Sequence, residues 1–171
     1  MKRELQQHSV IGSQVVASEC LVCGKDNEHG FHTQFLNLDD GRVAAVMTPC
    51  DEWQSYPDRL HGGVTCAILD ELLGRVTQIE NPWELAVTVE LNVKYRAPVP
   101  LDKEVHAVAW LVKDHKRLFD AAGEIVLDDG TIAAEATGRF LRTQAKDFAG
   151  QGENADFLYD DPRPYPESIW I

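Results

Sequence analysis

A glycine pair and a carboxylate share one mostly apolar segment, residues 60–74. Gly62 and Gly63 come first, and the free N–H groups at the start of a helix carry partial positive charge that stabilises an oxyanion. Asp70 follows about two helical turns later. A polarised carbonyl and a carboxylate are two requirements of acyl transfer. The glycines are equally compatible with a purely conformational role in a tight turn.

Asp70 has an acidic neighbour, Glu71, and helical periodicity does not decide which of the two is functional. The small residues on the same helix face as Asp70 are Gly63, Cys66 and Gly74. That face leaves room for a ligand or another helix to approach the carboxylate. The alternative is a structural carboxylate, exposed to solvent or paired with an arginine, as most carboxylates are.

Cysteine and histidine residues offer two further candidates. Cys20, Cys23, His29 and His32 have the residue types and compact spacing of a zinc site. We prefer a turn-rich loop with small buried thiols, and therefore expect no metal. A nucleophilic role for Cys66 would require a lowered thiol pKa, which no sequence feature indicates.

Length and charge limit the class of protein. The 171 residues suit one domain, and a formal charge of −12 argues against general nucleic-acid binding and against anionic membranes. No apolar run approaches the roughly 18 residues of a membrane span. The N-terminus also lacks the apolar core of a signal peptide. We therefore expect a cytoplasmic protein whose four cysteines are thiols.

Hydrophobic periodicity predicts one helix and several strands, an α+β architecture. The helix is expected over residues 62–79. Alternation and turn signals predict strands over residues 31–38, 42–48, 87–96, 104–113, 117–127 and 131–141. One helix cannot cover both faces of such a sheet, so we expect a two-fold dimer.

The two ends of the chain differ from the centre in composition. Residues 1–19 are predicted to form a short helix or an arm, and residues 20–143 the folded domain. Residues 144–171 are acidic and rich in proline. We expect this tail to be extended or partly disordered, and its aromatic residues to pack on a partner subunit.

The central segment resembles a known family. His61-Gly62-Gly63-Val64 followed by Leu69-Asp70 is similar to the motif of the hotdog-fold thioesterase superfamily, in its PaaI-like acyl-CoA thioesterase group. Residues 88–98 and 130–138 resemble later strands of that family, and Cys20-x-x-Cys23-Gly24 resembles an N-terminal element of some members. The resemblance spans residues 20–143. It implies the hotdog fold, in which a curved antiparallel sheet of five to six strands wraps one long central helix. It also implies a homodimer or a dimer of dimers with sites at the subunit interface.

The resemblance implies a reaction and a set of roles. The reaction is hydrolysis of an acyl-CoA thioester to free acid and CoA, without a cofactor, coenzyme A being part of the substrate. Asp70 would act as base or nucleophile, and the N–H of Gly62 or Gly63 would polarise the thioester carbonyl. His61 would hold the loop or assist at the thioester. Thr88 would position the water or the carboxylate.

Substrate contacts are expected around these residues. In the family, an asparagine or glutamine in the loop before the histidine often contacts the reacting centre. Ser55 stands at the commonest spacing here and Gln54 one residue earlier, and we favour Gln54. Basic residues at strand ends could hold the phosphates of coenzyme A or could form an ordinary solvated surface; they are Lys94, Arg96, Lys116 and Arg117.

Other interpretations remain open at this point. Trp53 and Tyr56 could line an acyl pocket, although a place in the core or at a dimer interface is favoured. A hotdog dehydratase or hydratase could use His61 as its catalytic histidine. A non-catalytic acyl-CoA-binding protein could have the same fold, because fold does not determine function.

Overall fold

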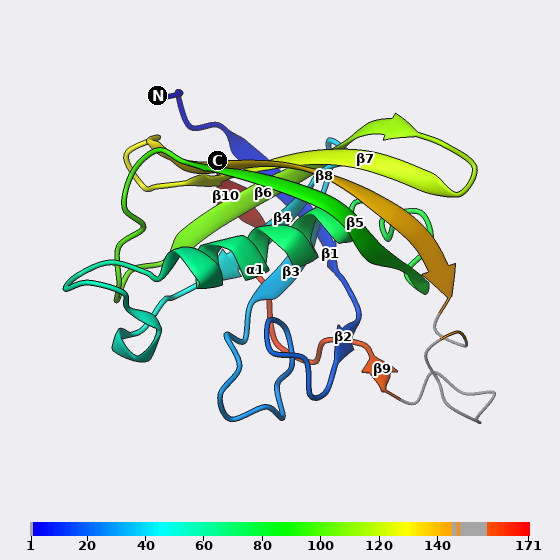
Figure 1. Ribbon diagram of the computed structural model, residues 1–171, viewed down its shortest axis with the longest axis horizontal. Coiled ribbons are helices and arrows are strands. Elements are labelled where there is room, and N and C mark those ends of the chain that lie inside the picture. Colours follow the sequence, from blue (N-terminus) through cyan, green and yellow to red (C-terminus); the bar gives the residue numbers. More distant parts are fainter. Residues whose placement is uncertain (1, 145–146, 148–156) are drawn as a thin grey trace.

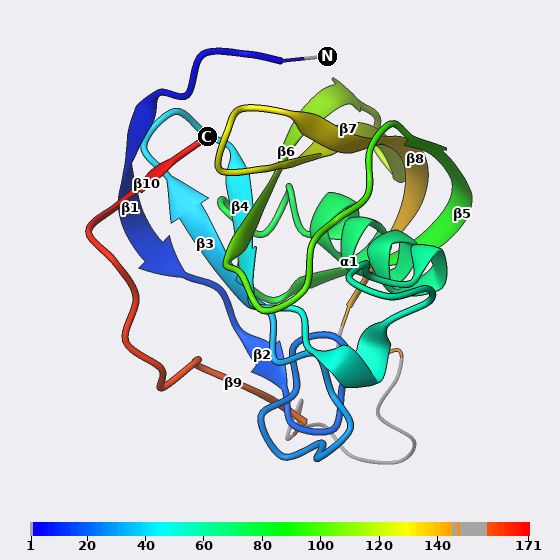
Figure 2. The same cartoon turned by 90° about the vertical axis from the view of Figure 1, so that its left-hand side faces the viewer.

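A computed structural model describes residues 2–144, 147 and 157–171 and contains one curved antiparallel sheet around a central helix (Figure 1). The helix α1 (Gly62–Gly74) lies in the concave face, and Figure 2 shows the sheet curling around it. The sheet has eight strands in the order β10 (Ser168–Trp170), β1 (Gln7–Ser13), β3 (Gln34–Leu38), β4 (Val43–Met47), β6 (Val105–Asp114), β7 (Leu118–Val126), β8 (Ile132–Gln144) and β5 (Glu84–Tyr95). The predicted α+β hotdog fold is confirmed.

The predicted number of strands, five to six, is too low. Six strands, from β3 to β5 in the sheet order, form the part of the sheet that periodicity identified. The other two, β1 and β10, extend the sheet at one edge. A separate two-stranded sheet joins β2 (Val16–Ala17) to β9 (Leu158–Tyr159), and a short 3-10 helix, η1 (Asp51–Trp53), precedes α1.

The main core lies between α1 and the sheet. One face of α1 buries Ile68, Leu69, Leu72 and Leu73 completely. On the side of the sheet, this core contains three large buried aromatic rings, those of Phe35, Phe119 and Phe140. Gly123 allows the closest approach, because a Cβ atom there would lie 2.7 Å from Leu73 Cδ1. This packing places the apolar face of α1 against the sheet.

The helix ends earlier than predicted, at Gly74 instead of residue 79. Residues 75–80 form hydrogen-bonded turns, in which the Gln78 N–H donates to the Arg75 carbonyl at 3.0 Å. Arg75 and Gln78 also donate from their side chains to main-chain carbonyls of other segments, Val15 and Glu84. These contacts hold the chain in a turn where periodicity alone predicts another helical turn.

Residues 2–19 do not form a helix. Their polar and apolar side chains alternate, and β1 pairs with β3 on one side and with β10 on the other. At the C-terminus, Ile169 and Ile171 are buried in a second apolar cluster with Leu36 and Leu38. The described end of the tail therefore packs on its own sheet through Ile169 and Ile171, while its aromatic residues Tyr165 and Trp170 are exposed, and their packing on a partner stays a prediction. Residues 145–146 and 148–156 of the predicted tail lie outside the described part, and the division at residues 19 and 143 stays a prediction.

Among the described residues, no helix has both the length and the apolar character needed to cross a membrane.

Candidate active site

His61 organises the turn that starts α1. It is the N-cap residue, and its Nδ1 accepts a hydrogen bond from the Gly63 N–H at 2.8 Å. Its own N–H donates to the Trp53 carbonyl at 2.8 Å and so ties the turn to η1. Because Nδ1 accepts, the neutral ring carries its proton on Nε2. These two hydrogen bonds hold the loop that leads into α1.

The two glycine N–H groups differ. That of Gly63 is occupied by His61, whereas that of Gly62 has no acceptor among the described residues. The carbonyl group of Gly62 is also fixed, because it accepts a hydrogen bond of 2.8 Å from the hydroxyl of Tyr95 at the end of β5. Of the two donors that the sequence offered, Gly62 is therefore the one free to polarise a ligand. Sequence reasoning missed Tyr95, since its partner lies 33 residues away.

Asp70 is joined to β5 by a hydrogen bond from Thr88, with Thr88 Oγ1 2.8 Å from Asp70 Oδ1. A β-bulge makes this contact possible. Thr88 lies opposite the buried Phe140, while Glu90 lies opposite the exposed Arg139, so the strand changes face at the intervening residue. Thr88 consequently faces α1. The remaining oxygen of Asp70 stays available to a ligand or a water.

Glu71 has a different role from its neighbour. Arg75 Nη2 lies 2.6 Å from Glu71 Oε1, and the Cys20 thiol donates to Glu71 Oε2 at 3.1 Å. Burial alone would raise the pKa of Glu71, but the charge of Arg75 and the hydrogen bonds lower it. Arg75 is itself buried and lies over the Phe35 ring. Glu71 is therefore the structural carboxylate of the pair.

A cleft of about 370 Å³ opens beside Asp70 and Thr88. On one side the lining is apolar and comes from β5 and β8, with Leu85, Ala86 and Phe140. The rest of the lining contains Cys20, Cys23, Glu71 and Arg75, together with Phe157 and Leu158, which pair with residues 17–18 next to the cysteines. The volume falls in the range of small-molecule sites. An apolar wall next to a carboxylate suits a ligand with an apolar chain and a reactive polar group.

The loop before His61 contains Gln54 and Ser55, the predicted substrate contacts, and the aromatic residue Trp53. Gln54 and Ser55 are exposed; Gln54 forms a bridge to Leu60, and the Ser55 N–H donates to the Arg59 carbonyl. Trp53 packs on Phe31, with ring centroids 4.9 Å apart, against the main core. Trp53 is therefore partly buried against the core, whereas Tyr56 is exposed, and a place for either residue at a dimer interface stays a prediction.

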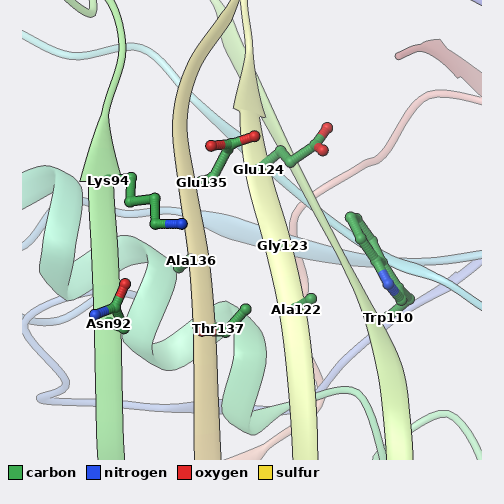
Figure 3. Close-up of a pocket in the computed structure, with 9 residues that line it drawn as sticks. All are labelled: Asn92, Lys94, Trp110, Ala122, Gly123, Glu124, Glu135, Ala136 and Thr137. Atoms are coloured by element: carbon green, nitrogen blue, oxygen red, sulfur yellow. The ribbon is translucent and has the colours of Figure 1, made fainter.

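The four basic residues predicted to hold phosphates do not form one cluster in a single chain. Arg96 follows the end of β5 and pairs with Glu135 at 2.8 Å, whereas Lys116 and Arg117 lie in the turn between β6 and β7. The strand register places these ends roughly 25 Å apart. Lys94 lies in a hollow of about 240 Å³ on the sheet face turned away from α1 (Figure 3). That hollow is remote from Asp70.

The cluster around Cys20 and Cys23 does not contain the two histidines of the possible zinc site. In the described chain, Cys20 and Cys23 cluster with Glu71, and neither His29 nor His32 belongs to that group. Burial, and then the charge of Asp70, raise the pKa of the Cys66 thiol. A raised pKa disfavours the thiolate, so Cys66 is not suited to be a nucleophile.

Comparison with known proteins gives consistent matches. Residues 58–134 match the family model of the thioesterase superfamily. The acyl-coenzyme A thioesterase THEM4 of Mus musculus is 28% identical over 112 residues, which are 65% of this chain and 47% of that protein. The thioesterase superfamily protein RHA08564 is 27% identical, with a TM-score of 0.67 over 72% of this chain and 60% of that one. The BH2602 protein of Bacillus halodurans, solved with CoA, is also 27% identical, with a TM-score of 0.59 over 67% of this chain and 76% of that one.

Residues 58–134 are therefore similar to the thioesterase superfamily. The chain spans about half the length of the curated relatives that it matches. His61, Gly62, Asp70 and Thr88 lie inside the matched segment. The cysteine pair and the tail that supplies Phe157 to the cleft lie outside that segment.

The structural role of Glu71 predicts a loss of stability on substitution. Glu71→Gln leaves the buried Arg75 charge uncompensated, and we expect the free energy of unfolding at pH 7 to fall by about 3 kcal/mol. The pKa of Glu71 is lowered by folding, so its contribution is complete above the unfolded pKa of roughly 4.3 and is lost as the pH falls further. Urea unfolding of both proteins should show the difference shrinking between pH 5 and about pH 3.

The matched control is Asp70→Asn, one residue away. Its carboxylate makes a single hydrogen bond, to Thr88, and we expect a change below about 1 kcal/mol. Equal stabilities of Glu71→Gln and the unsubstituted protein at pH 7 would contradict the structural role of Glu71.

Proposed function

We propose that this protein hydrolyses an acyl-CoA thioester to the free acid and CoA. The observation that carries the proposal is the Thr88–Asp70 hydrogen bond of 2.8 Å beside an apolar cleft. Thr88 occupies one carboxylate oxygen and leaves the other to act on water as a base or on the thioester as a nucleophile. The name of the mouse relative, an acyl-coenzyme A thioesterase, and the CoA in the BH2602 structure support this substrate class.

The second requirement is a donor for the carbonyl oxygen, which becomes negatively charged as the tetrahedral intermediate forms. The unoccupied N–H of Gly62, with the positive end of the α1 dipole, supplies such a donor. The departing group is a thiolate, which leaves without a strong general acid. The proposed reaction therefore needs no cofactor, because coenzyme A belongs to the substrate.

The separation of Gly62 and Asp70 along α1 supports a site that two chains share. Gly62 and Asp70 are eight residues apart on α1, or roughly 12 Å along its axis. One reacting carbonyl must lie within about 3–3.5 Å of its attacking group and within hydrogen-bond distance of its oxyanion donor. We infer that Asp70 and Thr88 of one subunit act with Gly62 of the partner subunit, across a two-fold axis that sets two α1 helices antiparallel.

The sheet offers an edge for such an association. β5 is the last strand in the sheet order, and its far side has no partner strand in the described chain. Val87, Val89 and Tyr95 on this strand are exposed apolar residues, with Val89 58% exposed. Long unpaired strand edges with apolar side chains favour pairing with another chain. A homodimer, or a dimer of such dimers, covers this edge.

The first prediction concerns turnover. A panel of acyl-CoAs with short, long and aromatic acyl groups, followed by release of free thiol, should identify a hydrolysed substrate. Asp70→Asn should lower kcat by about 10²–10⁴-fold, as expected for removal of a general base or nucleophile. Glu90→Gln, on the outward side of the bulge two residues after Thr88, is the matched control and should retain the rate.

The outcomes of this panel separate the alternatives. Tight binding of CoA esters without turnover would favour a non-catalytic binding protein. Hydration of an enoyl-CoA without thioester cleavage would favour a hydratase. An unchanged rate in Asp70→Asn would exclude Asp70 from the chemistry.

A second prediction concerns Thr88. Thr88→Val keeps the shape of the side chain and removes the hydroxyl, so kcat should fall about tenfold, equivalent to one hydrogen bond to a charged group. Thr88→Ser retains the donor and should stay within about threefold of the original rate. The same rate for valine and serine at this position would show that the hydrogen bond does not position Asp70.

A third prediction tests whether each site is shared by two chains. Gly62→Pro removes the proposed donor N–H at the first helical position, where proline is tolerated. We expect Gly62→Pro and Asp70→Asn to be inactive as separate proteins. A hybrid dimer carrying one chain of each, isolated with two affinity tags, should regain about half of the original activity, because one of its two sites is intact. An inactive hybrid, or a monomer by light scattering, would contradict the shared site.

A further inference from the structure

Cys20 and Cys23 lie in one tight turn whose side chains enter the wall of the cleft. The Gly24 N–H donates to the Cys20 carbonyl at 2.9 Å. A Cβ atom at Gly24 would lie 2.5 Å from that carbonyl oxygen, so the turn requires glycine immediately after the second cysteine. The two sulfur atoms and a Glu71 oxygen all lie within 4.8 Å of one another. Both thiols are free.

The two sulfurs have different surroundings. Cys20 is half-buried, lines the cleft, and receives a hydrogen bond from the Val22 N–H at 3.3 Å. Cys23 is buried and lies 3.2 Å from Arg75 Nη2. A hydrogen bond with Cys23 lowers the pKa of Cys20 to about 7, although burial and Glu71 oppose the shift; the same hydrogen bond and burial raise the pKa of Cys23. Cys20 is thus the accessible nucleophile and Cys23 the protected second thiol.

A metal ion is less compatible with this cluster than a change of oxidation state. Arg75 already supplies the cation, because it donates to both Glu71 and Cys23. Its guanidinium is held in place by the Val15 carbonyl, Gln78 and the Phe35 ring. A metal bound to the Cys23 sulfur would compete with the contact that this sulfur makes to Arg75 Nη2.

We propose that Cys20 and Cys23 form a dithiol that a hydroperoxide oxidises reversibly to an intramolecular disulfide. Cys20 sulfur attacks the terminal peroxide oxygen, the O–O bond breaks, and the products are a sulfenic acid on Cys20 and an alcohol, or water from hydrogen peroxide. Cys23 sulfur then attacks the Cys20 sulfur, the S–O bond breaks, and the hydroxyl leaves with the Cys23 proton as water. Two electrons pass from the thiols to the peroxide. This chemistry does not depend on the proposed hydrolysis.

The experiment measures thiols in the full-length protein. Brief treatment with hydrogen peroxide, removal of the reagent and alkylation should leave two of the four cysteines unreactive, with a mass about 2 Da lower before alkylation. Peptide mapping should place the bond between Cys20 and Cys23, and dithiothreitol should restore both thiols. The control, Cys50→Ser with Cys66→Ser, keeps only the proposed pair and should form the same bond.

Single substitutions distinguish the two roles. Cys23→Ser should accumulate a sulfenic acid on Cys20 that dimedone labels, whereas Cys20→Ser should label far less. Four reactive thiols after treatment, a bond that includes Cys50 or Cys66, or a bond between two chains would overturn the proposal. Mapping of the unsubstituted protein decides the question even where a serine variant does not fold.

Discussion

The buried ion pair between Glu71 and Arg75 is the interaction on which the arrangement of the site depends. A charge removed from water is tolerated only with a close partner and further hydrogen bonds. Arg75 has both, because it pairs with Glu71 and donates to the carbonyl of Val15 in the N-terminal segment. The pair therefore orients α1 with Glu71 toward residues 15–23. Successive helical residues point about 100° apart, so the same rotation turns Asp70 toward β5, where it meets Thr88.

The second constraint is local and belongs to the strand. Without the bulge after Thr88, regular alternation would place Thr88 and Glu90 on the same face of β5. The bulge separates them, with Thr88 on the helix side and Glu90 on the outer side. The hydroxyl and the carboxylate thus meet because of two independent features, the rotation of a helix and an irregularity in a strand. Each feature fixes one member of the pair.

Much of this fold could be predicted from the sequence because its signals are local. Alternation and Asp-Gly turns identified the six central strands, and the glycine pair identified the start of α1. The contribution of β1 and β10 could not be predicted, since β10 has only three residues and pairs with β1 at the opposite end of the sequence. The roles of Asp70 and Glu71 also depend on contacts with distant segments and could not be told apart from the sequence. Adjacent carboxylates look alike until the position of Arg75 relative to the N-terminal segment is known.

Cys20 connects these observations, because its thiol donates to the oxygen of Glu71 that Arg75 does not occupy. Formation of the neutral Cys20–Cys23 disulfide would leave Oε2 without its thiol donor while Oε1 keeps its ion pair. The cluster would then lose one hydrogen bond without losing its charge balance, and the rotation of α1 would still be fixed by Arg75. A change of oxidation state at Cys20 and Cys23 would therefore alter one wall of the cleft, whereas the Thr88–Asp70 contact depends on β5 and the opposite side of the helix.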